Sequence, residues 1–150
     1  MNSQFANSNG SQLTIEARLR TMRTLWIAML LSVAAYYGFT LLQTRSTALE
    51  PNNKFFLILV VISVSTTLVS FLIKSQLLRR AIEQQQVGQV QQAYIIAWAV
   101  SEVAALLGLV DYFVTGDRYY YAMFIIAAFG QLLNFPRREH VENASFKRSL

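Results

Sequence analysis

The chain has 150 residues, of which 54% are hydrophobic and only 14% are charged. An ordinary soluble domain carries about 25% charged residues, so the composition excludes a typical soluble globular protein. The chain has no cysteine, which excludes disulfides and thiolate chemistry. The net charge is +5, but the basic residues are confined to short segments between apolar runs. This distribution is not typical of a nucleic-acid-binding protein, and we expect no nucleic-acid partner.

The N-terminal segment predicts a polar tail. MNSQFANSNGSQLTIE is rich in Asn, Ser and Gln and can bury little apolar surface. We therefore expect residues 1–17 to be a disordered cytoplasmic tail. Residues 18–136 are expected to form a membrane domain, and residues 137–150 a basic cytoplasmic tail.

Four apolar runs approach the roughly 20 residues that a helix needs to cross the hydrocarbon core. They lie at 24–42, 55–73, 93–114 and 119–135. The connections QTRSTALEPNN and TGD are short, which favours antiparallel neighbours. The sequence therefore predicts an all-α membrane protein, a four-helix up-and-down bundle of two hairpins. The longer linker KSQLLRRAIEQQQVGQVQQA is predicted to extend the second span as an amphipathic helix that breaks near Gly88.

Lysine and arginine flank these runs unevenly. With four alternating spans, ten of the 13 fall on one side and three on the other. The richer side is cytoplasmic in membrane proteins, so we expect both termini in the cytoplasm. The arginines expected to set this topology or to contact anionic lipid are Arg18, Arg20, Arg23, Arg79, Arg80, Arg137 and Arg138.

The first and third runs are similar to each other. SVAAYYGF at 32–39 aligns without gaps with EVAALLGL at 102–109, which suggests an internal repeat of the two hairpins. In this alignment Ser32 occupies the position of Glu102.

Small residues form stripes at helical spacing on these two runs. Helices pack through small-residue faces inside lipid, so these stripes predict packing surfaces. The stripe of the third run consists of Ala97, Ser101, Ala104 and Gly108. A rougher stripe on the first run consists of Ala28, Ser32, Ala35 and Gly38.

Glu102 lies near the middle of the third run, where an ionised acid is costly. We expect it to be protonated, paired or facing a polar cavity. No lysine or arginine lies at that depth. Two interpretations stay open: a proton or cation site formed with Ser101 and Ser32, or a protonated acid that hydrogen-bonds between helices. Asp111, close to the outer end, is expected to be interfacial and hydrated.

Motifs of catalytic chemistry are absent from the sequence. There is no GxSxG, no HExxH and no glycine-rich phosphate loop. The one histidine, His140, stands in the basic tail and is expected to be isolated from other ligand types. We expect no enzymatic activity, no cofactor and no metal site.

Two resemblances to known families extend these expectations. LLRRAIEQQQ followed by AYIIAWAVSEVAALLGLVDYF resembles the helical hairpin of the ATP synthase rotor subunit c. Glu102, followed by Gly108, Leu109 and Val110, matches its carboxylate-bearing helix, and the arginine pair at 79–80 matches its polar loop. The resemblance implies proton translocation, although FFLILVVISVSTTLVSFLI has none of that family's packing glycines.

The whole chain is similar to a family of small four-span bacterial membrane proteins, through YIIAWAVSE, YFVTG and FPRREHVEN. This resemblance implies a bacterial inner-membrane protein. We therefore expect a non-enzymatic accessory or assembly subunit of a membrane complex, with the lipid bilayer and other subunits or further copies as partners. The alternative is proton or cation translocation through Glu102 in a subunit c-like oligomer.

Overall fold

The computed structural model describes residues 3–43, 53–115 and 118–145. Within these residues the chain forms five α-helices and no strand, so the expected all-α class is confirmed. The helices are α1 (Ser3–Leu42), α2 (Asn53–Glu83), α3 (Val87–Val114), α4 (Tyr121–Leu133) and α5 (Arg138–Ser145). Most of the predicted connection between the first two runs, including Arg45, lies outside the described residues.

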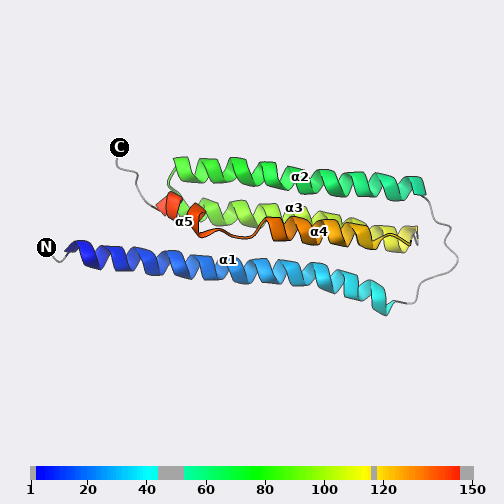
Figure 1. The fold of residues 1–150 in the computed structure, drawn as a ribbon, viewed down its shortest axis with the longest axis horizontal. Helices are drawn as coiled ribbons and strands as arrows, with labels where there is room; N and C mark the ends of the chain where they lie inside the picture. The colour runs from blue at the N-terminus through cyan, green and yellow to red at the C-terminus, as the bar shows by residue number, and fades with distance from the viewer. Residues whose placement is uncertain (1–2, 44–52, 116–117, 146–150) are drawn as a thin grey trace.

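The helices α1 to α4 lie alongside one another along the long axis of the molecule (Figure 1). The short helix α5 lies at the end where α1 begins. Helix α3 contacts each of the other four helices, which makes it the centre of the packing. The residues of α3 therefore decide what the interior of the protein contains.

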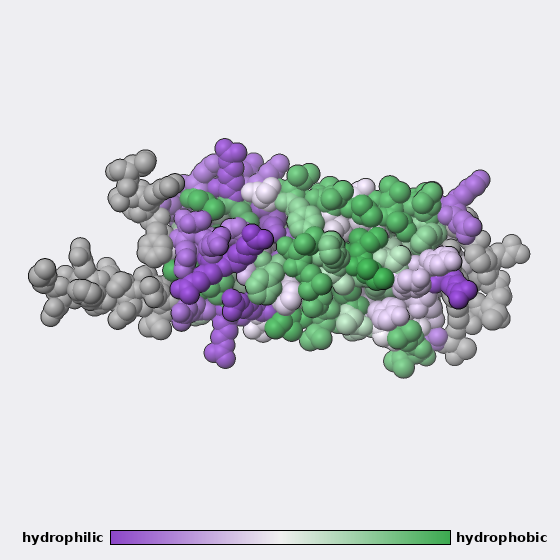
Figure 2. Space-filling view, in the orientation of Figure 1, coloured by the Kyte–Doolittle hydropathy of each residue, from purple (hydrophilic) through white to green (hydrophobic). Residues whose placement is uncertain are grey.

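Three helices are long and apolar enough to cross a membrane: Ile15–Leu42 of α1, α2 and α3. Figure 2 shows an apolar band around the middle of the molecule, with hydrophilic residues toward both ends. The fourth predicted run differs, because α4 has only 13 residues. At 1.5 Å per residue it spans about 20 Å, against about 30 Å for the hydrocarbon core. The helix ends before Pro136, which has no backbone N–H to continue it.

Helix α1 begins at Ser3, within the segment predicted to be a polar tail. Ile15, Leu19 and Met22 recur at helical spacing and are all buried. They pack in one cluster with Leu78 of α2 and Trp98 of α3. Helical packing thus starts before the first long apolar run, and the polar residues upstream continue the same helix.

The predicted extension of the second run is confirmed, since α2 continues to Glu83. Leu78 and Ala81 are buried, whereas Arg79 and Arg80 are exposed, as an amphipathic helix requires. The predicted break near Gly88 is confirmed to within a few residues. The chain turns at residues 84–86, where Gln85 takes a φ of 53°, and Gly88 lies inside α3.

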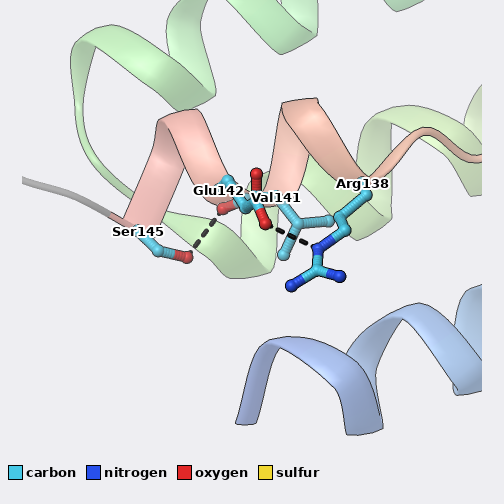
Figure 3. A network of polar contacts seen from close by, with 4 residues as sticks. All are labelled: Arg138, Val141, Glu142 and Ser145. Atoms are coloured by element: carbon cyan, nitrogen blue, oxygen red, sulfur yellow. Dashed lines mark hydrogen bonds and ion pairs between the residues drawn. The ribbon is translucent and has the colours of Figure 1, made fainter. Parts of the chain in front are cut away.

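The short helix α5 is held by its own polar contacts and by its apolar face. Arg138 Nε donates to Glu142 Oε1 over 2.6 Å, and Ser145 Oγ donates to the carbonyl of Val141 (Figure 3). Val141 and Ala144 are buried in the same cluster as Trp98. This packing fixes α5 against the end of the bundle where α1 begins.

Candidate functional site

Glu102 lies between α1 and α3 and contacts α1 directly. Its Oε1 lies 2.5 Å from Ser32 Oγ, and the side chain of Tyr36 hydrogen-bonds to the same carboxyl group. Both partners lie on α1, one turn apart, so the carboxyl group joins the two helices. Glu102 and Ser32 are each partly exposed. Two of the three residues of the predicted proton or cation site, Glu102 and Ser32, are therefore in contact.

Ser32 Oγ donates to Glu102 Oε1 and also lies 2.7 Å from the carbonyl oxygen of Met29, one turn earlier on α1. Ser32 and Tyr36 are thus the polar partners that α1 offers to the carboxyl group.

Ser101, the third residue of the predicted site, lies elsewhere. Its hydroxyl is fully buried and makes contacts of 3.1 Å to Ser70 Oγ and 3.0 Å to the carbonyl of Ala97. Neighbouring positions on a helix are rotated by about 100°, so Ser101 faces α2 and α4 while Glu102 faces α1. The structure does not bring Ser101 to the carboxyl group.

The predicted small-residue face of α3 is buried along its whole length: Ala97, Ser101, Ala104 and Gly108. A Cβ added at Gly108 would lie 3.0 Å from Phe124 Cε2, which shows how closely α4 approaches. The stripe expected on α1 is not buried, since Ala28 and Ala35 are exposed and Gly38 has open space beside it. Helix α1 instead buries Val33 and Thr40, one position away from that stripe.

The end of α4 is anchored by aromatic side chains of α1 and α3. Trp26 Nε1 donates to the carbonyl of Gln131 over 2.8 Å, and Trp98 Nε1 donates to the carbonyl of Asn134 over 2.9 Å. The hydroxyl of Tyr94 accepts from the backbone N–H of Arg137 over 3.2 Å. Irregular backbone at membrane depth is tolerated where protein groups satisfy it, as these three side chains do.

Four buried polar residues gather at the same place and are named here the amide cluster. They are Ser70 of α2, Ser101 of α3, and Gln131 and Asn134 at the end of α4. Gln131 Nε2 donates to the carbonyl of Trp98 over 3.1 Å, and Asn134 Nδ2 donates to the carbonyl of Gly130 over 3.0 Å. Asn134 Nδ2 also lies 3.4 Å from Ser70 Oγ and 3.5 Å from Ser101 Oγ. The cluster joins three helices through hydrogen bonds.

Gly130 allows this close approach. A Cβ at this position would lie 2.8 Å from Thr67 Cγ2 and 3.3 Å from Ser101 Oγ. A side chain at this position would require the buried side chains of Thr67 and Ser101 to shift. The amide cluster was not predicted from the sequence, although Gln131 and Asn134 stand in an apolar run just before Pro136, a signal that was available.

Asp111 is fully buried, so the expectation of a hydrated carboxylate is wrong. Thr115 Oγ1 donates to Asp111 Oδ1 over 2.6 Å, and the buried Tyr112 is its neighbour in the chain. One helical turn separates Asp111 from Thr115, so the last turn of α3 supplies a hydrogen bond that the prediction assigned to water.

The predicted topology arginines are all exposed. They lie in the first half of α1, at the end of α2 and at the start of α5, which Figure 1 places at one end of the molecule. Two of them form ion pairs along their own helices, Arg79 with Glu83 and Arg138 with Glu142. Arg23 lies over the ring of Phe135, with 5.8 Å from its Cζ to the ring centroid.

His140 of α5 contacts a tyrosine of α3. Its Nδ1 lies 2.6 Å from the hydroxyl of Tyr94. Burial lowers the pKa of His140 below its ordinary value, and the positive charges of Lys74 and Arg137 lower it further. Among the described residues there is no group of three or more His, Cys, Asp or Glu that could hold a metal ion.

Comparisons with protein-family models, with curated proteins and with solved structures found no match for this chain.

Proposed function

We propose that this chain is a non-enzymatic, multi-pass membrane protein that acts as a small accessory or assembly subunit of a membrane complex. In this role Glu102 is a protonated hydrogen-bond donor that holds α1 against α3. The observation that carries the proposal is the hydrogen bond from Ser32 Oγ to Glu102 Oε1, which joins α1 to α3. In the proposed role, a neutral Glu102 in this fixed contact serves to pack α1 against α3.

The proposed architecture is four membrane crossings in an up-and-down bundle, with the first two helices and the next two forming repeated hairpins. Helix α4 is short, and the chain continues from it toward α5 through Asn134 and Phe135, whose backbone N–H groups donate to carbonyl groups of the last turn of α4. This turn extends the apolar segment beyond the roughly 20 Å of the helix. The donors Trp26 and Trp98 make such a crossing tolerable, because they satisfy carbonyl groups at its break.

The proposed location is a bacterial inner membrane, with both ends of the chain in the cytoplasm. Support comes from the exposed arginines at the end of the molecule that contains α5 and the start of α1. Lys54 and Arg118 lie at the other ends of the long helices. The richer end is cytoplasmic under the positive-inside rule.

The second candidate function is proton or cation translocation through Glu102 in an oligomer like that of ATP synthase subunit c. The partial exposure of Glu102 on the side of the bundle favours it, because a translocating carboxyl group must exchange its proton. In this mechanism the contact to Ser32 is broken when the proton leaves.

One experiment separates the two functions. Glu102→Gln keeps a hydrogen-bond donor but removes the titrating group. We expect the variant to form the same complex as the wild type, as judged by native mass and co-purifying chains after mild extraction. The matched control is Ser32→Ala, which removes the partner and keeps the acid. We expect it to weaken α1 docking by about 0.6 kcal/mol, a typical value for a hydrogen bond between membrane helices.

Infrared difference spectroscopy between wild type and Glu102→Gln reports the protonation state directly. The accessory role predicts the band of a neutral carboxylic acid at pH 7. An ionised carboxylate at pH 7 in the wild type, or a homo-oligomer of many copies that loses proton transport in Glu102→Gln, would overturn the accessory role in favour of translocation.

A further inference from the structure

A basic pocket opens between α2 and the segment that follows α4. It has a volume of about 740 Å³. Its cationic lining includes Lys74 of α2, Arg137 of the connecting segment and, when protonated, His140 of α5. Phe71 and Leu133 form an apolar part of its wall. The pocket lies where the chain passes from the end of α4 at Leu133 to the start of α5 at Arg138.

Tyr94 of α3 organises the three basic residues. Its buried hydroxyl accepts from the backbone N–H of Arg137 and lies 2.6 Å from His140 Nδ1. Lys74 Nζ lies 5.6 Å from the centroid of the Tyr94 ring and 5.4 Å from that of Phe71. When the Tyr94 hydroxyl donates to Nδ1, the neutral imidazole carries its hydrogen on Nε2 as a further donor. The basic groups are thus held by one rigid side chain.

The positive charges of Lys74 and Arg137 have no acidic partner in the part of the chain that the structure describes. Glu83, the acid that lines the pocket, pairs with Arg79, and the other ion pair joins Arg138 to Glu142. Lys74 is half-buried, and an unpaired buried charge is unfavourable. Such a site favours an anionic ligand.

An apolar groove of about 310 Å³ continues from this pocket between α2 and α4. The two share Phe71 and Leu133 as wall residues. The groove extends past Leu68 and Phe129, which are both exposed on the apolar part of the surface. The pocket thus supplies positive charge at one end, and the apolar groove continues from the other. This arrangement matches an amphiphilic anion.

We propose that the pocket and the groove together bind one anionic phospholipid, with its phosphate among Lys74, Arg137 and His140 and an acyl chain between α2 and α4. Basic pockets between membrane helices on the cytoplasmic side are suited to anionic headgroups. Lys74 follows the apolar run of α2 directly, which places it at headgroup depth. The proposal requires α2 and α4 to face a bilayer, but it is independent of the accessory role and of the protonation of Glu102.

The test measures lipid retention by the purified full-length protein in phosphatidylcholine nanodiscs with added phosphatidylglycerol. Native mass spectrometry and the shift in Tm serve as readouts. We expect phosphatidylglycerol to be retained in preference to phosphatidylcholine. Lys74→Gln and Arg137→Gln are each expected to weaken retention about fivefold, as loss of one cationic contact at a lipid surface implies.

Arg80→Gln is the matched control, because Arg80 is an exposed cation at the same end of α2 that does not line the pocket. Equal weakening in Arg80→Gln, or equal retention of the two lipids, would overturn the proposal in favour of general surface attraction. Competition by glycerol phosphate as strong as that by phosphatidylglycerol would assign the pocket to a soluble phosphate instead. Lys74→Arg keeps the charge and should retain the lipid, which separates loss of binding from loss of folding.

Discussion

The amide cluster at the end of α4 is fully buried and joins three helices, whereas Glu102 and Ser32 form a partly exposed contact between α1 and α3. The amide nitrogens of Gln131 and Asn134 find acceptors on this packed side, whereas their buried side-chain oxygens have no hydrogen-bond partner within the described residues. The carboxyl group of Glu102 has its partners, Ser32 and Tyr36, on the loosely packed side of α3 that faces α1.

The packing of the two helices reflects this difference. In the most apolar part of α3, 44% of the residues are buried, against 11% in α1. Substitutions on the side of α3 that faces α4 are therefore expected to lower the stability of the whole fold. Substitutions on the side that faces α1 are expected to weaken only the docking of α1.

The largest expected effect comes from Gly130→Ala. The new Cβ would lie 2.8 Å from Thr67 Cγ2 and 3.3 Å from Ser101 Oγ, so the buried side chains around the amide cluster must shift. We expect a loss of about 2–3 kcal/mol of unfolding free energy, in the range for overpacked cores. Unfolding in detergent, followed by circular dichroism, measures it.

Gly38→Ala on α1 is the control for this substitution. Gly38 has nothing within 4 Å of an added Cβ, so alanine should stabilise the helix by up to about 1 kcal/mol. Equal effects of the two substitutions would refute the distinction between a packed and an open side of α3.

A smaller effect is expected from Trp98→Phe, which removes the indole donor to the carbonyl of Asn134. A buried carbonyl without its donor costs about 1–2 kcal/mol. Trp26→Phe should cost less, because the carbonyl of Gln131 also accepts from the backbone N–H of Asn134 over 3.1 Å. Thermal unfolding of both variants tests this order, and a larger loss of stability in Trp26→Phe than in Trp98→Phe would contradict it.

Local patterns in the sequence predicted the helical class, the extension of α2 and the stripe of small residues on α3, which is buried. Each of these depends on the periodicity of one helix. The burial of Asp111 and the separation of Ser101 from Glu102 depend on which neighbour covers which face, and periodicity does not contain that information. The break after α2 was predicted near Gly88 and lies a few residues earlier, because Gln85 adopts the positive φ for which glycine is the usual residue.

The amide cluster is a second feature that patterns within one segment could not predict. Gln131 and Asn134 were visible as polar residues in an apolar run, but their function as a junction appears only when α4 ends early. The shortness of α4 follows from Pro136 together with side-chain donors that lie 36 and 105 residues away in sequence. A pattern within one segment cannot supply such distant partners.

The smallest expected effect is a pH dependence that comes from His140 and leaves Glu102 uninvolved. Burial, Lys74 and Arg137 lower the pKa of His140, while Glu139 opposes them and Tyr94 contacts the ring. The unfolded chain then binds more protons just below the ordinary value of about 6.5, so stability falls as the pH drops through that range. Tm measured from pH 8 to pH 5 should decline in the wild type and in Glu102→Gln, and decline less in His140→Asn. A decline that persists in His140→Asn but disappears in Glu102→Gln would identify Glu102 as the titrating group, and its neutral contact with Ser32 would then no longer hold at pH 7.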